Sequence, residues 1–385
     1  NYSIFACKGG QGVFKRYSFG SEAKVRRGAL FTVNAATSLA SVLAGSVLLG
    51  GDLIWVQNGA YSLGNTTVWT SADQGSDQDG PVFLVGESVP TIAAGAYFSP
   101  SGSFSGTSAL KLSARQVTVK NLGFRAFTGS AGIEVMPTAD KTRLISNRFE
   151  RCAVGIRLGQ AGGVGHTGPV LVQNNLITNT SPGVVAGAMG IHCPTKPVLS
   201  PGGFGGFYSI VNNTLVLEQG SGVQFDFVPL ECPVNCGSAY TLTGGHTVEL
   251  FNNIIKCDAG GAACTASLDA CVRAGGRLAS NNNNLVGPVI GAVFAQKYCT
   301  LSTWRAAVFA DKESISVDPA FTGGDYSLAN HSECVNRGRW RELLTANLYP
   351  TDYLGGSSPE RVRAARVDVG DGGVGDRVAL DRPGG

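Results

Sequence analysis

Short stretches in which hydrophobic and polar residues alternate recur along most of the chain, and many of them end in the same way. Hydrophobic residues are followed by Asn, one further residue and another hydrophobic residue, as in Leu144–Phe149 and again in Leu250–Ile254. The asparagines of successive copies are Asn147, Asn174, Asn213, Asn252 and Asn283, which are 27, 39, 39 and 31 residues apart. Alternation with a period of two predicts β-strands, and a recurrence at this interval predicts stacked repeat units.

A second pattern lies upstream in each unit and consists of Gly, a β-branched residue, any residue and a hydrophobic residue. Its copies are Gly132–Val135, Gly155–Leu158, Gly190–Cys193 and Gly222–Phe225, with Ala109–Leu112 as the first member. The two patterns alternate strictly, which a β-sandwich with coincidental Asn turns would not require. No unit can bury its hydrophobic face alone, so coils of about 25 residues must stack about 4.8 Å apart. We therefore predict an all-β, right-handed parallel β-helix, a solenoid whose turns and inter-coil ladders use the asparagines. Loop insertions are expected at 194–206 and 229–245.

These features resemble the bacterial right-handed parallel β-helix proteins related to pectate lyases, over residues 38–370. Gly50–Tyr61 is similar to the start of the first coil in that family, and Asp318–Phe321 and Asp352–Gly355 are similar to its closing segment. The resemblance implies that Ser38–Leu49 forms a short helix that caps the open end. After Gly370 the chain departs from the family pattern, so the last strand is expected to end early. The expected division is an N-terminal extension (1–37), the β-helix (38–370) and a Gly- and Asp-rich tail or linker (371–385).

Composition narrows the function classes. The net charge is +3 and no basic stripe is interleaved with aromatic residues, so nucleic acid is not an expected partner. The apolar run at 29–49 is too polar for a membrane span. Ten cysteines without CxxC spacing favour disulfides in an oxidising compartment, and so a secreted or cell-surface protein; buried free thiols in a reducing compartment are the alternative. The pairing is open, and the disulfide candidates are Cys193, Cys232, Cys236, Cys257, Cys264 and Cys271.

The variable position of the second pattern should point outward, because alternate residues of a strand face opposite ways. Stacking then brings five residues into one outward row about 20 Å long, and Asp226 follows on the same face. The row contains Lys111, Glu134, Arg157, His192 and Gln224. A polysaccharide lyase would use Arg157 to neutralise a uronate carboxylate and His192 or Lys111 as the base, whereas Gln224 would bind carbohydrate. Alternatively, these are solvated strand residues whose alternating charges stabilise the stack.

Two function classes remain. The first, which we favour, is a non-catalytic extracellular or cell-surface protein for adhesion, assembly or glycan binding, with a polysaccharide or a surface or matrix component as its partner. The alternative is a polysaccharide lyase, or a glycoside hydrolase, that acts on acidic polysaccharide through Lys111, Glu134, Arg157, His192 and Asp226. The paired-Asp, Gly-His-Gly and Arg-x-Pro-x-x-Arg patterns of the related enzymes are missing. No cofactor and no metal site are expected, although Ca²⁺ is left open by the acidic stretch at 73–80. End-to-end self-association is also left open.

Overall fold

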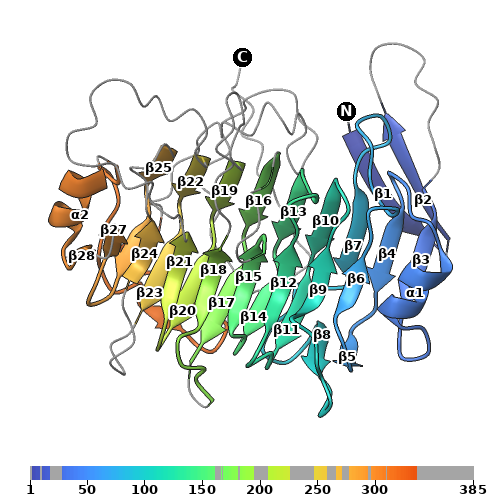
Figure 1. Ribbon diagram of the computed structural model, residues 1–385, viewed down its shortest axis with the longest axis horizontal. Coiled ribbons are helices and arrows are strands. Elements are labelled where there is room, and N and C mark those ends of the chain that lie inside the picture. Colours follow the sequence, from blue (N-terminus) through green and yellow to red (C-terminus); the bar gives the residue numbers. More distant parts are fainter. Residues whose placement is uncertain are drawn as a thin grey trace.

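The computed structural model describes residues 2–8, 11–17, 28–160, 166, 168–180, 183–194, 207–225, 247–257, 266–270, 277–293, 296–308 and 310–335. In this part of the chain the strands form three long sheets that run side by side along the molecule, and successive strands visit the sheets in turn (Figure 1). Neighbouring strands within each sheet are parallel, apart from the last pair of the third sheet. The predicted parallel β-helix is confirmed.

Each sheet adds one strand per coil. Sheet 1 contains β3 (Leu30–Val33), β4 (Leu53–Val56), β7 (Val82–Gly86), β10 (Val117–Lys120), β13 (Thr142–Ile145), β16 (Pro169–Gln173), β19 (Phe207–Val211), β22 (Thr247–Phe251) and β25 (Arg277–Asn281). Sheet 2 contains β5 (Gly59–Leu63), β8 (Ala96–Pro100), β11 (Leu122–Arg125), β14 (Arg148–Glu150), β17 (Leu176–Asn179), β20 (Thr214–Leu217), β23 (Ile254–Cys257) and β26 (Asn284–Val286). Sheet 3 contains β6 (Thr67–Trp69), β9 (Ser108–Leu112), β12 (Ala131–Val135), β15 (Val154–Leu158), β18 (Met189–Cys193), β21 (Ser221–Phe225), β24 (Ala266–Ala270), β27 (Gly291–Val293) and β28 (Gln296–Tyr298).

Two antiparallel hairpins lie outside these sheets. One pairs β1 (Tyr2–Lys8) with β2 (Gln11–Tyr17), and the other pairs β29 (Phe321–Thr322) with β30 (Ser327–Leu328). The first hairpin and β3 both fall within the predicted N-terminal extension, and β3 pairs in parallel with β4. Sheet 1 therefore begins before residue 38, where the β-helix was expected to start. Residues 336–385 and nearly all of the predicted insertions at 194–206 and 229–245 lie outside the described residues.

The interior is built from columns of like side chains. In sheet 2, Phe98, Phe124 and Phe149 occupy the same inward position of successive coils and are 2% exposed or less. Their rings stack with centroid separations of 5.7 and 5.2 Å. Aliphatic residues of the other two sheets complete one continuous core along the molecule. Each coil thus hides its hydrophobic face against the coils above and below it.

Asparagines form a buried ladder at the bend between sheets 1 and 2. Its members are Asn147, Asn175, Asn213, Asn253 and Asn283, each 1% exposed or less. The side-chain amide of each donates to the amide oxygen of the next at 3.0–3.1 Å, and the backbone N–H donates to the same oxygen at 2.9 Å. The five coils that carry these asparagines are thereby joined by side-chain as well as backbone hydrogen bonds.

The sequence alignment of this repeat was wrong by one residue in two coils. Asn174 and Asn252, which were grouped with Asn147, Asn213 and Asn283, precede the ladder and adopt φ of 54° and 57°. That left-handed conformation is one that Asn tolerates better than most residues. Two adjacent asparagines therefore have different tasks, one to turn the backbone and one to form the ladder.

The two ends of the coil are closed by short helices, which lie at opposite ends of the molecule in Figure 1. Helix α1 (Leu39–Gly45) begins at Ser38, whose hydroxyl accepts from the backbone N–H of Ser41, and buries Leu39 and Val42 in the core. The predicted helix at 38–49 is wrong beyond Gly45, because Asp73 accepts from the backbone N–H of Leu48 and Ser46 is extended. At the far end, α2 (Leu301–Val308) buries Trp304, whose indole N–H donates to Asp311 at 2.9 Å.

The cysteines from Cys152 onward fall into three groups. Cys152, Cys299 and Cys334 are free thiols. Cys193 and Cys257 lie in the hydrophobic core, and their part in disulfides stays a prediction. The other four candidates, Cys232, Cys236, Cys264 and Cys271, lie outside the described residues.

Removal of one ladder amide should destabilise the whole stack. Asn213→Ala leaves the backbone carbonyl of Val172 and the amide groups of Asn175 and Asn253 without their partner, at a cost of about 1–3 kcal/mol for each buried group left unsatisfied. We expect a loss of about 3 kcal/mol or more in the free energy of unfolding, measured by urea denaturation. Asn212→Gly is the control, since Gly accepts the φ of 56° at that position and should cost less than about 1 kcal/mol. Equal effects of the two substitutions would contradict the assigned roles.

The free thiols should differ sharply in reactivity. Complete burial raises the pKa of Cys152 to about 12, whereas Cys299 is exposed. At pH 8 the Cys152 thiol is therefore protonated as well as shielded, and only the thiolate is nucleophilic. We expect iodoacetamide to modify Cys299 in the native protein and Cys152 only after unfolding, as followed by peptide mass spectrometry. Similar rates at the two positions under native conditions would rule out this placement of Cys152.

Candidate functional site

The predicted row on sheet 3 is aligned by the strand register. Lys111 is opposite Glu134, Glu134 opposite Arg157, Arg157 opposite His192, and His192 opposite Gln224. One further coil places Asp269 opposite Gln224. Asp226, the sixth residue of the prediction, lies outside the described residues. We call the aligned positions 111, 134, 157, 192 and 224 the sheet 3 row.

Asp269 was missed from the sequence because its strand lacks the Gly that introduces four of the five other copies. The strand β24 reads Ala-Ser-Leu-Asp-Ala and lies between two cysteines. Its alternation covers only five residues, which is too short to distinguish from a loop on sequence pattern alone. The register between β21 and β24 places Asp269 next to the end of the row, beside Gln224.

Charges within the row compensate one another. The Glu134 side chain is 5% exposed and its carboxylate lies 3.6 Å from the guanidinium of Arg157. The hydroxyls of Thr107 and Ser108 also donate to Glu134, at 3.4 Å each. His192 is 9% exposed, whereas Lys111, Arg157 and Gln224 are half-buried. The row thus contains the Lys111 cation, the Glu134–Arg157 ion pair and the Gln224 amide. The Glu134 carboxylate is fixed by Arg157, Thr107 and Ser108.

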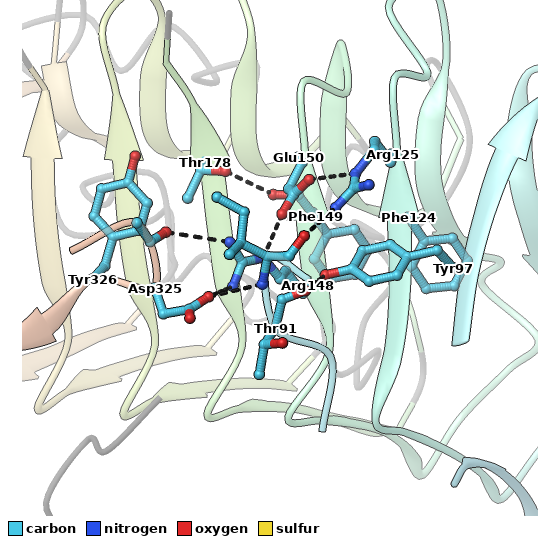
Figure 2. Close-up of polar contacts among 12 residues, drawn as sticks. Thr91, Tyr97, Phe124, Arg125, Arg148, Phe149, Glu150, Thr178, Asp325 and Tyr326 are labelled. Carbon is cyan, nitrogen blue, oxygen red and sulfur yellow. Dashed lines mark hydrogen bonds and ion pairs between the residues drawn. The ribbon is translucent and has the colours of Figure 1, made fainter. Parts of the chain in front are cut away.

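A second polar site lies on the outer face of sheet 2 and was not predicted. Figure 2 shows Arg148 between two carboxylates, Glu150 of the same strand and Asp325 of the turn between β29 and β30. The nitrogen–oxygen distance is 2.5 Å in both ion pairs, and Arg148 is only 3% exposed. Glu150 also pairs with Arg125 of the preceding coil at 2.5 Å. We call Tyr97, Arg125, Arg148, Glu150 and Asp325 the sheet 2 cluster.

The aromatic member of this cluster is fixed from two sides. The ring of Tyr97 occupies the space above Gly123, where an added Cβ would lie 2.2 Å from the ring. The guanidinium of Arg125 lies 4.2 Å from the ring centroid on the exposed side. The Tyr97 hydroxyl donates to the carbonyl of Thr91, and burial raises the pKa of this tyrosine to about 12. Tyr97 is therefore a neutral hydrogen-bond donor that supports the charged groups.

The two carboxylates of the cluster stabilise the charged form of Arg148. Burial alone would lower the pKa of Arg148, but the carboxylates of Glu150 and Asp325 outweigh it and raise that pKa above its ordinary value. Sequence pattern could have placed Arg148 and Glu150 on one face, because they are two residues apart in a strand. It could not have supplied Asp325, which is 177 residues further along the chain.

The described residues contain no group of three or more His, Cys, Asp or Glu side chains arranged to hold a metal ion. None of the helices in the described ranges has the length and apolar character needed to cross a membrane. The acidic stretch at 73–80 that suggested Ca²⁺ lies within the described residues and contains no such group, and Ca²⁺ binding elsewhere stays a prediction.

No protein-family model matches the chain. No curated protein matches it either. Among solved structures, a rhamnogalacturonan lyase is similar over 70% of this chain and 71% of its own, with 10% identity and a TM-score of 0.48. Pectate lyase Pel9A is similar over 86% of this chain and 95% of its own (12% identity, TM-score 0.36), and pectin methylesterase PemA from Erwinia chrysanthemi over 68% and 80% (14% identity, TM-score 0.35). The parallel β-helix fold is shown by the strand pairing of this chain itself, and neither the family nor the activities of these enzymes are carried over to it.

Proposed function

We propose that this protein is a non-catalytic extracellular or cell-surface β-helix protein that binds a polysaccharide along the sheet 3 row. The observation that carries the proposal is the ion pair between Glu134 and Arg157 inside the row. A lyase needs a cation that is available to the carboxylate of its substrate when the neighbouring proton is removed. Arg157 already compensates a buried carboxylate of its own sheet, which favours a binding role over a catalytic one.

The other candidate catalytic groups of the row support the same conclusion. His192, the candidate base, is 9% exposed, and a base must reach the proton it removes within about 2.6–3.2 Å or through one water. A hydrolase would need two carboxyl groups about 5–9.5 Å apart across a sugar ring. Glu134 is the one carboxylate of the row whose side chain the structure describes, and it is engaged by Arg157, Thr107 and Ser108.

The dimensions and chemistry of the row suit a glycan chain. From Lys111 to Gln224 it crosses five coils, and at about 4.8 Å per step it is about 19 Å long. Partly exposed lysine, arginine and glutamine side chains along this line can donate to the hydroxyls and carboxylates of several sugar units. An adhesive or assembly role at the cell surface would follow from a rigid face of this length, and Ca²⁺ is part of the test because an acidic glycan can carry it.

Binding should weaken when a cation of the row is removed. We expect Lys111→Ala and Arg157→Ala to raise the dissociation constant for polygalacturonate or alginate about tenfold, since a charge-assisted hydrogen bond contributes about 1.5–3 kcal/mol. Affinity electrophoresis with and without Ca²⁺ measures this. Arg115→Ala removes the same charge from an exposed loop and is the matched control.

The same samples decide between the two function classes. Release of unsaturated uronates by the unmodified protein, abolished in Arg157→Ala, would make it a lyase and overturn the proposal. New reducing ends without unsaturated products would indicate a hydrolase. Absence of binding to any glycan, or equal weakening by Arg115→Ala, would exclude the sheet 3 row as the binding site.

A further inference from the structure

The chain returns along the outside of the coil after its last described helix. Val317 exchanges two hydrogen bonds with the side chain of Asn284 in β26, and Asp318 lies 3.5 Å from Lys256 in β23. The turn between β29 and β30 then reaches β14, where Asp325 pairs with Arg148, and Tyr326 shares a hydrogen bond with Thr180 just beyond β17. This segment, residues 317–329, runs backwards over the outer face of sheet 2 and is called the strap.

The strap supplies a charge that the sheet lacks. The sheet's own members of the sheet 2 cluster include two guanidinium groups, Arg125 and Arg148, but a single carboxylate, Glu150. Without Asp325 these three residues would have a net charge of +1, although Arg148 is 3% exposed. A buried charge that has lost a partner is strongly unfavourable. The sheet 2 face therefore requires one further carboxylate from outside the sheet.

The donors around Asp325 converge as they do around a bound ligand. One oxygen of its carboxylate accepts from the guanidinium of Arg148 and also from the backbone N–H of Ile92, at 2.9 Å, in the loop between β7 and β8. A second guanidinium nitrogen of Arg148 donates to the carbonyl of Gly324 at 3.3 Å. Figure 2 shows Asp325 directed at Arg148 from the strap, across from the strand that carries Glu150. Donors from two separate segments thus surround a single carboxylate.

The site is reachable from solvent. The Asp325 side chain is 28% exposed, that of Arg125 is 33% exposed, and Ile92 beside them is 57% exposed. In contrast, Arg148 beneath them is buried and already ordered by Glu150. A small anion could therefore reach the position of the Asp325 carboxylate without any rearrangement of the coil.

We propose that the sheet 2 face at Arg148 is a carboxylate-binding site, and that Asp325 of the strap occupies it as an internal ligand that an external carboxylate displaces. The ligand class is a single carboxylate group, for which Arg148 provides the charge and the backbone N–H of Ile92 the second donor. This site is on a different sheet from the sheet 3 row and does not depend on glycan binding there. The strap should therefore detach from the sheet 2 face as the concentration of the external carboxylate rises.

Chemical rescue tests the binding site. Asp325→Ala should lower the melting temperature, and sodium acetate should raise it again with a half-maximal effect on the order of 10 mM, because ligands of the folded state stabilise it by mass action. Sodium chloride at equal ionic strength should not do so. Asp318→Ala is the matched control, since it removes a strap carboxylate whose side chain is 74% exposed and lies 3.5 Å from Lys256. If Asp325→Ala does not fold, Asp325→Asn keeps the shape, removes the charge and is expected to show the same rescue.

The outcomes of this experiment are distinct. Rescue by acetate in the Asp325 variant alone supports the site. Equal stabilisation by chloride, or equal rescue of Asp318→Ala, would show a general salt effect and overturn it. A variant that folds with an unchanged melting temperature would also overturn it, because Arg148 would then not need the strap carboxylate.

Hydrogen exchange in the unmodified protein tests the displacement. With acetate present, peptides covering 321–328 should exchange several times faster than with chloride, whereas separate peptides from β12 and β15 should not change. Acetate rescue of the variant without faster exchange in the unmodified protein would mean that an external carboxylate enters the site only when Asp325 is absent, and would overturn the proposed displacement.

Discussion

Backbone pairing between coils at a fixed spacing is the constraint on which the rest of this structure depends. A slip of one residue between a strand and the next coil would turn all of its hydrophobic side chains outward, so burial of one face strongly constrains the register. Once that register is set, every position of a coil is stacked on the same position of its neighbours. The phenylalanine column of sheet 2, the asparagine ladder and the sheet 3 row are all results of this single condition.

Repetition makes a small local preference into a large structural effect. A single buried asparagine would carry polar groups that need partners, at a cost of about 1–3 kcal/mol for each one left unsatisfied. In a stack, the amide of Asn175 receives from Asn147 and donates to Asn213, so each member satisfies the next. The ladder must still end somewhere, and at its last step the side-chain amide of Asn283 donates to Asp311 while its backbone N–H donates to the hydroxyl of Ser314. Asp311 and Ser314, which follow α2, therefore accept the last hydrogen bonds of the asparagine ladder.

The sequence was sufficient for the fold because its information is periodic. Alternation within strands and the strict order of two patterns specified the coil, and the variable position of the Gly-containing pattern specified which residues align in sheet 3. Where two adjacent residues had the same identity, as in Asn174 and Asn175, the pattern could not say which one turned the backbone. The pattern also predicted that the first helix continues to Leu49, because Asp73, which accepts from the N–H of Leu48, lies 25 residues further along the chain. Asp325 could not be assigned at all, since its partner Arg148 is far away in sequence and no period connects them.

The two polar faces differ in how their charges are satisfied, and this difference follows from the same stacking. On sheet 3 the neighbour of Glu134 in register is Arg157, so opposite charges meet within the sheet and the face is complete without help. On sheet 2 the register brings Arg125 beside Glu150 but places Leu176 beyond Arg148, a neighbour that offers no charge. The coil cannot correct this deficit without breaking its register, so the missing carboxylate has to come from a segment that does not belong to the stack. The strap is therefore attached to the regular solenoid at Arg148, the position where the neighbouring coil in register supplies no opposite charge.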